Sequence, residues 1–359
     1  MQIKECRSIV SFSMNNLPPT LKRLVIIDCS NLRCLVDQGE NTSISSTCSL
    51  EHLEIMVCPL LVSLSLPIRL QNLLVANCSR LASLSSSGEL PSGLKQLSVK
   101  DCLGLESIVQ AIHETSSLEL LEICRCGNLK SLPQGLNKLS NVKKINILLC
   151  RNLVSLTASG LPTRKLESLR ISDCQSLADL PNMHKLTALK KLSLFDCSPD
   201  FPFTEQGLPT SLTSISVTLP KFCHSLLKWG LHKLTSLKEL FIDGQQCPHV
   251  VTFPPEGCVL PPTLTSITVI NFGNLRSLLT MGFRNVGCLR ELWLLDCPEI
   301  ESLPEKDVLL SVRKLYIRRC HISLLGQLIM NQGPEWLKIS HMPEVIVDRQ
   351  SIIPKATWE

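Results

Sequence analysis

The sequence predicts an α/β solenoid in which about 15 short parallel strands line a concave face and loops or short helices cover the convex side. Two observations predict it. Leucine, any two residues, leucine, any residue and isoleucine recur about every 24 residues along the chain. A cysteine follows this isoleucine after three residues, and leucines follow the cysteine after three and six, as in Leu50, Leu53, Ile55, Cys58, Leu61 and Leu64. The pattern is that of leucine-rich repeats, which form a horseshoe.

Each leucine-x-isoleucine segment alternates apolar and variable residues, which is the period of a strand with one buried face. A unit of this length cannot bury its apolar face alone, so successive turns must stack and complete one another's core. The rest of each repeat must return over the convex side, with room for loops and short helical turns. Leucine-proline pairs such as Leu90-Pro91 and Leu161-Pro162 mark these returns, where a ladder N–H is not needed.

One position of the repeat, which we call the cysteine slot, holds most of the 18 cysteines. A small buried group that donates a weak S–H bond to loop carbonyls suits a position where the strand turns inward. Because equivalent slots offer no unique pairing, we expect reduced structural thiols in a reducing cytosol. The slots hold Cys6, Cys29, Cys58, Cys78, Cys102, Cys126, Cys150, Cys174, Cys197, Pro220, Cys247 (two residues late), Phe272, Cys297, Cys320 and Met342.

This periodicity predicts a single leucine-rich repeat domain over residues 1–359, with about 15 repeats, an irregular zone at 200–246 and a C-terminal cap at 333–359. The last repeat is expected to have a strand at Leu337–Ile339. Met1 and Ile3 already occupy strand positions, so the chain opens without a polar cap. We therefore expect a preceding domain or a truncated gene product, and self-association through residues 1–12.

Composition narrows the classes of partner. The net charge of +5 comes from 36 basic and 31 acidic residues spread through the repeats, which does not predict a nucleic-acid partner. No apolar run of membrane-spanning length and no leader sequence is seen, so membrane insertion and secretion are not expected. The expected location is the cytoplasm.

No arrangement of residues predicts catalysis or a metal site. The eight histidines are scattered over the repeats without ligand spacing. Cys124 and Cys126 are close in sequence, but Cys124 falls on the open face of its strand and Cys126 in the inward slot, so they point differently. We expect no enzymatic activity, metal or cofactor.

The variable residue between leucine and isoleucine forms a column along the concave face, and this column carries whatever specificity the chain has. Three of the chain's few aromatic residues lie in this column. Large amphipathic and guanidinium side chains are typical of interface cores. One alternative is that these aromatic side chains pack against loops of 200–246 or against another domain. Another is that they have no role. The candidates for partner contact are Phe241, Trp293, Tyr316, Arg318, Lys338, Phe195, Glu54, Glu122 and Arg170.

The leucines after the cysteine slot, the leucine-proline returns and the closing segment Pro334–His341 occur together in this chain. In these features, and over essentially its whole length, it resembles the C-terminal leucine-rich repeat region of plant nucleotide-binding immune receptors of the coiled-coil class. The resemblance implies a cytoplasmic module that recognises a pathogen effector or a guarded host protein and holds an adjoining nucleotide-binding switch off. No phosphate loop, switch domain or coiled coil is recognisable, so ADP or ATP binding is expected only of a parent receptor.

An alternative is the substrate-binding leucine-rich repeat region of an F-box ubiquitin-ligase adaptor, which also contains repeated cysteines. That class continues after the cysteine with isoleucine-threonine-aspartate-x-glycine and a longer helix. This chain continues with leucine-x-x-leucine, often followed by proline, which favours the receptor class.

Overall fold

The computed structural model describes residues 1–353 except 15–16, 37–47, 111, 113–115, 157–159, 179–182, 198–206 and 219–229. The chain divides into two compact units, Met1–Leu189 with Asp196–Phe201 and Lys190–Phe195 with Pro202–Glu359. The prediction of one domain over 1–359 stays a prediction. The irregular zone lies partly outside the described residues, as does the slot assigned to Pro220.

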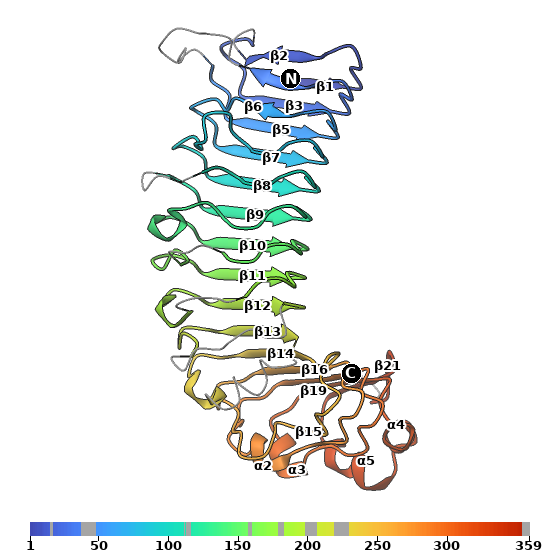
Figure 1. The fold of residues 1–359 in the computed structure, drawn as a ribbon. Coiled ribbons are helices and arrows are strands. Elements are labelled where there is room, and N and C mark those ends of the chain that lie inside the picture. The colour runs from blue at the N-terminus through green and yellow to red at the C-terminus, as the bar shows by residue number, and fades with distance from the viewer. Residues whose placement is uncertain are drawn as a thin grey trace. The chain divides into compact units, whose positions relative to one another are not determined.

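In the first unit, parallel strands pair in the order of the sequence, each with its neighbour in the next turn (Figure 1). The register is fixed, so that Glu54 lies beside Val25 and Leu74, and Glu122 beside Ser98 and Asn146. The strands are Gln2–Lys4 (β1), Arg23–Ile27 (β3), His52–Met56 (β5), Asn72–Ala76 (β7), Gln96–Lys100 (β8), Leu120–Cys124 (β9), Lys144–Leu148 (β10) and Ser168–Ser172 (β11).

The second unit repeats this arrangement with its own parallel strands and closes with an antiparallel pair. Trp293 lies beside Thr268 on one side and Tyr316 on the other. The strands are Lys191–Phe195 (β12), Ser214–Thr218 (β13), Glu239–Asp243 (β14), Ser266–Ile270 (β16), Glu291–Leu295 (β18), Lys314–Arg318 (β19), Glu344–Val347 (β20) and Gln350–Ser351 (β21).

The core of both units lies on one side of the sheet, because the second and fourth residues of each strand point inward. In β9 these are Leu121 and Ile123, and in β18 they are Leu292 and Leu294; all four are buried, while their neighbours along the strand are half-exposed. Removing such side chains from water in every turn supplies the main driving force for stacking. The predicted leucine-rich repeat solenoid with short parallel strands is confirmed.

The returning side of each turn has structure that the sequence did not predict. In the first unit Ser11–Ser13 (β2), Cys34–Val36 (β4) and Ser63–Leu64 (β6) form a second parallel sheet, and Thr252–Phe253 (β15) pairs with Ser277–Leu278 (β17) in the second. Short helices complete the returns, as expected. They are the 3₁₀ helices Leu136–Lys138 (η2), Met183–Lys185 (η3) and Leu231–Lys233 (η4) and the α-helices Thr280–Phe283 (α2) and Lys306–Leu309 (α3).

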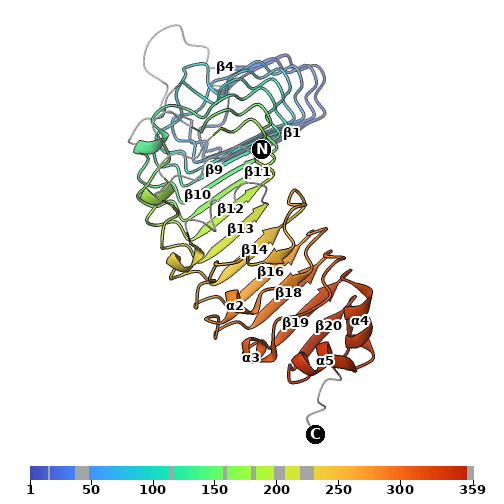
Figure 2. The same cartoon turned by 60° about the horizontal axis from the view of Figure 1, so that its bottom comes forward.

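The predicted last strand is wrong. Residues Leu337–Ile339 belong to helix Gly333–Ile339 (α5), which follows helix Ile322–Ile329 (α4) and precedes β20 (Figure 2). Pro334 stands in the first turn of α5, where its fixed φ favours a helix, and leucine-x-isoleucine spacing alone does not distinguish the two structures. Met342 therefore follows a helix instead of filling a cysteine slot.

At most cysteine slots, with Cys247 as an exception, the chain leaves the strand through a residue with positive φ. Aspartate and asparagine often precede the slot because they tolerate this left-handed conformation better than most residues. The expected S–H bonds to carbonyls are present, but the acceptors belong to strands instead of loops. Cys102 Sγ lies 3.4 Å from the carbonyl of Lys100, the last residue of its own strand, and 3.9 Å from the carbonyl of Val75 in the neighbouring strand. The residues with positive φ are Glu5, Asp28, Val57, Asn77, Asp101, Arg125, Leu149, Asp173, Asp196, Asn271, Asp296 and Arg319.

Most slot thiols are buried, while Cys6 and Cys197 are half-exposed, and none of those in the described residues forms a disulfide. Every cysteine in the described part of the chain is a free thiol. Burial disfavours the charged thiolate, so it raises the pKa of Cys58 and of Cys150 to about 11 and that of Cys174 to about 12. These three slots are structural positions with little thiolate at neutral pH.

Candidate protein-binding surface

The first, third and fifth residues of each strand stand on the side of the sheet opposite the core, which we call the open face. In the second unit the third residues include four large apolar side chains, and the fifth residues include three more. The third residues are Ser193, Ser216, Phe241, Thr268, Trp293, Tyr316 and Ile346, and the fifth are Phe195, Thr218, Asp243, Ile270, Leu295 and Arg318.

The indole of Trp293 is held by three contacts. Its ring stacks on Tyr316, with centroids 4.7 Å apart and planes inclined by 23°, because the two residues are paired in adjacent strands. Its Nε1–H donates a hydrogen bond of 3.2 Å to Glu291 Oε2. Lys314 Nζ lies 5.4 Å from the ring centroid, a cation–π arrangement. The pair is a preorganised, half-exposed aromatic platform.

Phe195 and Phe241 form a second aromatic pair. Their rings meet edge to face, with centroids 5.8 Å apart and an interplanar angle of 75°. They belong to β12 and β14, so their contact spans the intervening strand β13, where the open-face residues are the smaller Ser216 and Thr218. Thr218 is only 9% exposed although it lies on the open face.

Three further residues complete this apolar surface, and the sequence analysis missed them. Ile270 and Leu295 are half-buried fifth residues of β16 and β18, and Ile346 is aligned with Tyr316 in β20. For Ile270 and Leu295 the available signal was an apolar residue at the fifth position of the strand. Ile346 was missed because the last strand was predicted at the wrong residues. We call the seven residues the aromatic band: Phe195, Phe241, Ile270, Trp293, Leu295, Tyr316 and Ile346.

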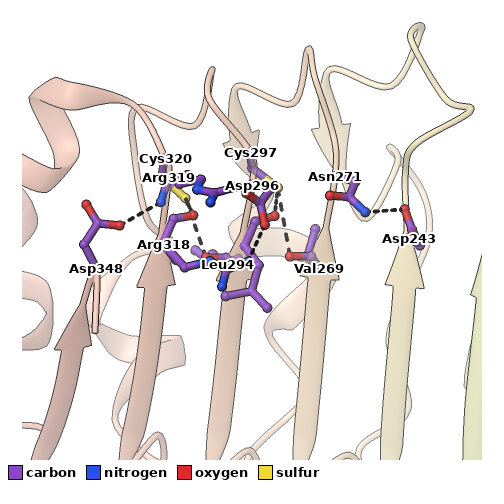
Figure 3. Close-up of polar contacts among 11 residues, drawn as sticks. Asp243, Val269, Asn271, Leu294, Asp296, Cys297, Arg318, Arg319, Cys320 and Asp348 are labelled. Atoms are coloured by element: carbon purple, nitrogen blue, oxygen red, sulfur yellow. Dashed lines mark hydrogen bonds and ion pairs between the residues drawn. The ribbon is translucent and has the colours of Figure 1, made fainter. Parts of the chain in front are cut away.

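Arg318 stands beside this band, but its charge is already compensated (Figure 3). Arg318 Nη2 lies 2.8 Å from Asp296 Oδ2, and Arg319 Nη1 lies 3.0 Å from Asp296 Oδ1. The bond from Arg318 is the main reason why the pKa of Asp296 is lowered. The backbone N–H of Arg319 also donates to Asp348 Oδ1 at 2.9 Å. These bonds hold the end of β19, which gives Arg318 a structural setting at the edge of the band.

Lys338 is not on the open face. It lies in α5, is 15% exposed, and its Nζ contacts Glu335 Oε1 at 3.0 Å and Glu305 Oε1 at 3.4 Å. Nζ also donates to the carbonyl of Leu303 at 3.0 Å, while the buried Glu335 carboxylate accepts the backbone N–H of Leu303 at 2.7 Å. This network attaches α5 to the turn that precedes α3, which gives Lys338 a structural setting.

The three charged candidates of the first unit lie on its open face, as expected. Glu54 is paired with Arg23 at 2.6 Å, and Glu122 with Lys100 at 2.8 Å. The bond from Lys100 is the largest cause of the lowered pKa of Glu122. Arg170 is exposed and forms no ion pair within the described ranges. The third and fifth residues of the described strands of this unit mix polar and aliphatic side chains and include no aromatic one.

Within the described residues, no group of three or more histidine, cysteine, aspartate or glutamate side chains is arranged to hold a metal ion. Among those residues no helix has the length and apolar character needed to cross a membrane.

Comparison with known proteins gives the chain a context. It is 29% identical over 190 residues to a putative disease resistance protein of Arabidopsis thaliana, a match that covers 53% of this chain. A second match, 35% identical over 95 residues, is to the disease resistance protein RRS1B of the same plant and covers 25% of the chain. The chain is similar to plant disease resistance proteins. These matches span 13% and 7% of the two relatives, so the chain corresponds to a small part of each.

Among solved structures, the chain is similar to YopM, a leucine-rich effector protein from Yersinia pestis. The sequences are 23% identical, the TM-score is 0.48, and the match covers 87% of this chain and 78% of YopM. No family profile matches the chain.

Proposed function

We propose that this chain is the recognition region of a plant intracellular immune receptor, and that its aromatic band binds a pathogen effector or a guarded host protein. The aromatic band supports this proposal: it groups seven large apolar side chains, four of them aromatic, on the open face of the second unit, whereas the third and fifth residues of the described strands of the first unit include no aromatic side chain. Exposed apolar patches of this kind mark interaction sites, and tryptophan and tyrosine are enriched among the residues that dominate binding.

The similarity to disease resistance proteins supports a role in defence. We propose in addition that an adjoining nucleotide-binding domain of the parent receptor contacts this chain and is held inactive by it, and that the location is cytoplasmic. The array of unpaired buried thiols is compatible with a reducing compartment. Any nucleotide would belong to that adjoining domain.

The proposal is tested by measuring how a panel of pathogen effectors and host proteins binds the full chain and two variants. The first variant replaces Phe241, Trp293 and Tyr316 by alanine, and the control is Lys185→Ala on the exposed surface of η3. Truncating one anchor typically costs about 2 kcal/mol or more, so the triple variant should lose at least about 30-fold in affinity. A partner that binds the triple variant as tightly as the unmodified chain would refute the aromatic band as its site.

A further inference from the structure

The residues that immediately precede the strands form a row along one edge of the sheet, which we call the leading row. The strand register places successive members side by side, about 4.8 Å apart. In the first unit the row is Lys22, Glu51, Gln71, Lys95, Glu119, Lys143 and Glu167. In the second unit it is Lys190, Thr213, Lys238, Thr265, Arg290, Arg313 and Pro343.

In the first unit, lysines of the leading row form ion pairs with glutamates of the same row. Lys22 Nζ lies 3.1 Å from Glu51 Oε1, and Lys143 Nζ lies 2.8 Å from Glu119 Oε2. The bond from Lys143 lowers the pKa of Glu119. Lys95, between these two pairs, donates from Nζ to the amide oxygen of Gln71 in the neighbouring turn at 3.1 Å, so the lysines of this row have side-chain partners in adjacent turns.

In the second unit the same row has cations and no acid. Arg290 and Arg313 are direct neighbours, joined through the backbone by the N–H of Arg313, which donates to the carbonyl of Arg290 at 2.9 Å. Both are exposed, and in the part of the chain that the structure describes neither guanidinium forms an ion pair. Two like charges at adjacent turns repel each other, and nothing in the row offsets them.

Between these arginines and the last turn the surface is hollowed into an open groove of about 650 Å³. Its two carboxylates already have partners: Glu344 Oε1 lies 3.2 Å from Lys314 Nζ, and Glu291 accepts the Trp293 indole N–H. The guanidinium groups are therefore the donors left for a ligand. The groove is lined by Arg290, Glu291, Arg313, Lys314, Pro343 and Glu344.

The groove adjoins the aromatic band. Glu291 and Lys314, which line it, both contact the ring of Trp293. Arg290 precedes Trp293 by three residues of a strand, a span of about 10 Å, which three residues of an extended peptide also cover. A ligand can thus reach the cationic groove and the aromatic platform with side chains close together in its own sequence.

We propose that the groove binds a carboxylate side chain from an acidic segment of a partner protein, whose nearby apolar side chain rests on the Trp293–Tyr316 pair. This inference deepens the proposed function and rests on it. Guanidinium groups bind carboxylates through paired N–H donors, and here two of them stand at neighbouring turns. Glu291 and Glu344 flank the groove and would repel a dense polyanion such as nucleic acid, so an isolated carboxylate is the occupant that fits the charges.

The test uses the full chain and a fluorescein-labelled dodecapeptide, Glu-Gly-Gly-Leu repeated three times, with binding followed by fluorescence anisotropy up to millimolar protein. The glutamate peptide should bind, and Arg290→Gln with Arg313→Gln should weaken it at least ten-fold. Trp293→Ala should weaken it as well, because the leucines lose their platform. Lys143→Gln in the leading row of the first unit is the matched control and should leave binding unchanged. Circular dichroism melting of each variant establishes that it folds.

Several outcomes would overturn the inference. These are no binding of the glutamate peptide, equal binding of the same peptide with glutamine for glutamate, or indifference to the arginine changes. Displacement of the peptide by micromolar inorganic phosphate or duplex DNA would assign the groove to another anion class. With a protein partner from the effector panel, loss of binding in the Phe241, Trp293 and Tyr316 variant but not in the arginine variant would leave the proposed function standing and refute this inference alone.

Discussion

The third residues of successive strands are Val25, Glu54, Leu74, Ser98, Glu122, Asn146 and Arg170 in the first unit, but Ser193, Ser216, Phe241, Thr268, Trp293, Tyr316 and Ile346 in the second. The second and fourth residues do not differ in this way, since in both units they are buried leucine, isoleucine or valine. The same backbone register therefore supports two different surfaces. Because inward and outward positions alternate, the open face can gain aromatic side chains without altering the core.

The leading row shows the same contrast in charge. In the first unit, acids and bases pair across neighbouring turns, whereas the second unit places Arg290 beside Arg313 without an acid. An aromatic platform and a groove with two arginines that form no ion pair among the described residues thus occur together in one unit. Such a combination is typical of recognition surfaces and is not needed for stacking the repeats.

The largest expected effects test whether the two interiors are equivalent. Leu169→Ala in β11 and Leu240→Ala in β14 should each lose about 2 to 5 kcal/mol of unfolding free energy, because both side chains are buried and truncation leaves a cavity. Chemical denaturation with two spectroscopic probes measures the loss. If only one of the two variants were destabilised, the claim of a common core would fail.

The aromatic band should affect binding more than stability. Tyr316→Ala removes a stacked contact of about 0.5 to 1.5 kcal/mol from a half-exposed pair, so its melting temperature should fall much less than that of Leu240→Ala. The comparison is made by thermal melting alongside the binding assay. A Tyr316 variant that melts like the core variant would show that the ring is packed instead of presented.

Because of the cysteine slots, the first unit should lose stability before the second unit as the pH becomes alkaline. Burial raises the pKa of Cys58, Cys150 and Cys174 from 9.0 to between about 11 and 12. A raised folded-state pKa stabilises the fold below the unfolded value, and this contribution is lost as pH rises from about 9 through the folded pKa. Most slot cysteines lie in the first unit, so its hydrogen exchange should accelerate first over this range.

At pH 7.5 a thiol reagent should modify the exposed Cys288 quickly and the buried slot thiols slowly, until denaturant is added. Mass spectrometry of the labelled peptides identifies the sites. Rapid labelling of Cys150 in the folded chain would contradict the assigned burial.

The smallest expected effect is that of nucleotides. The chain has no phosphate-cradling motif in either region, so calorimetry with ADP and ATP should give no heat of binding and thermal melting should not shift. Micromolar affinity for either nucleotide would refute the expectation that only an adjoining domain binds it.

The sequence by itself determined the repeating turn, the inward leucines and isoleucines, the cysteine slot and the placement of Phe241, Trp293 and Tyr316 on one face. These follow from local periodicity, because a strand with one buried face leaves a period of two and a stacked repeat leaves a period of about 24 residues. Where local spacing was ambiguous, as at Leu337–Ile339, the prediction failed: the segment is helical and Glu335 and Lys338 anchor it to another turn.

Only the tertiary structure decided what depends on contacts between turns. The stacking of Trp293 on Tyr316, the contact of Phe195 with Phe241 across β13, and the engagement of Arg318 by Asp296 all join residues that are more than 20 positions apart in the chain. No sequence signal indicated the neighbours Arg290 and Arg313 either, which form no ion pair in the described part of the chain, because their juxtaposition follows from the strand register. Periodicity indicates which side of a strand a residue occupies, but the register between turns decides which residue stands beside it.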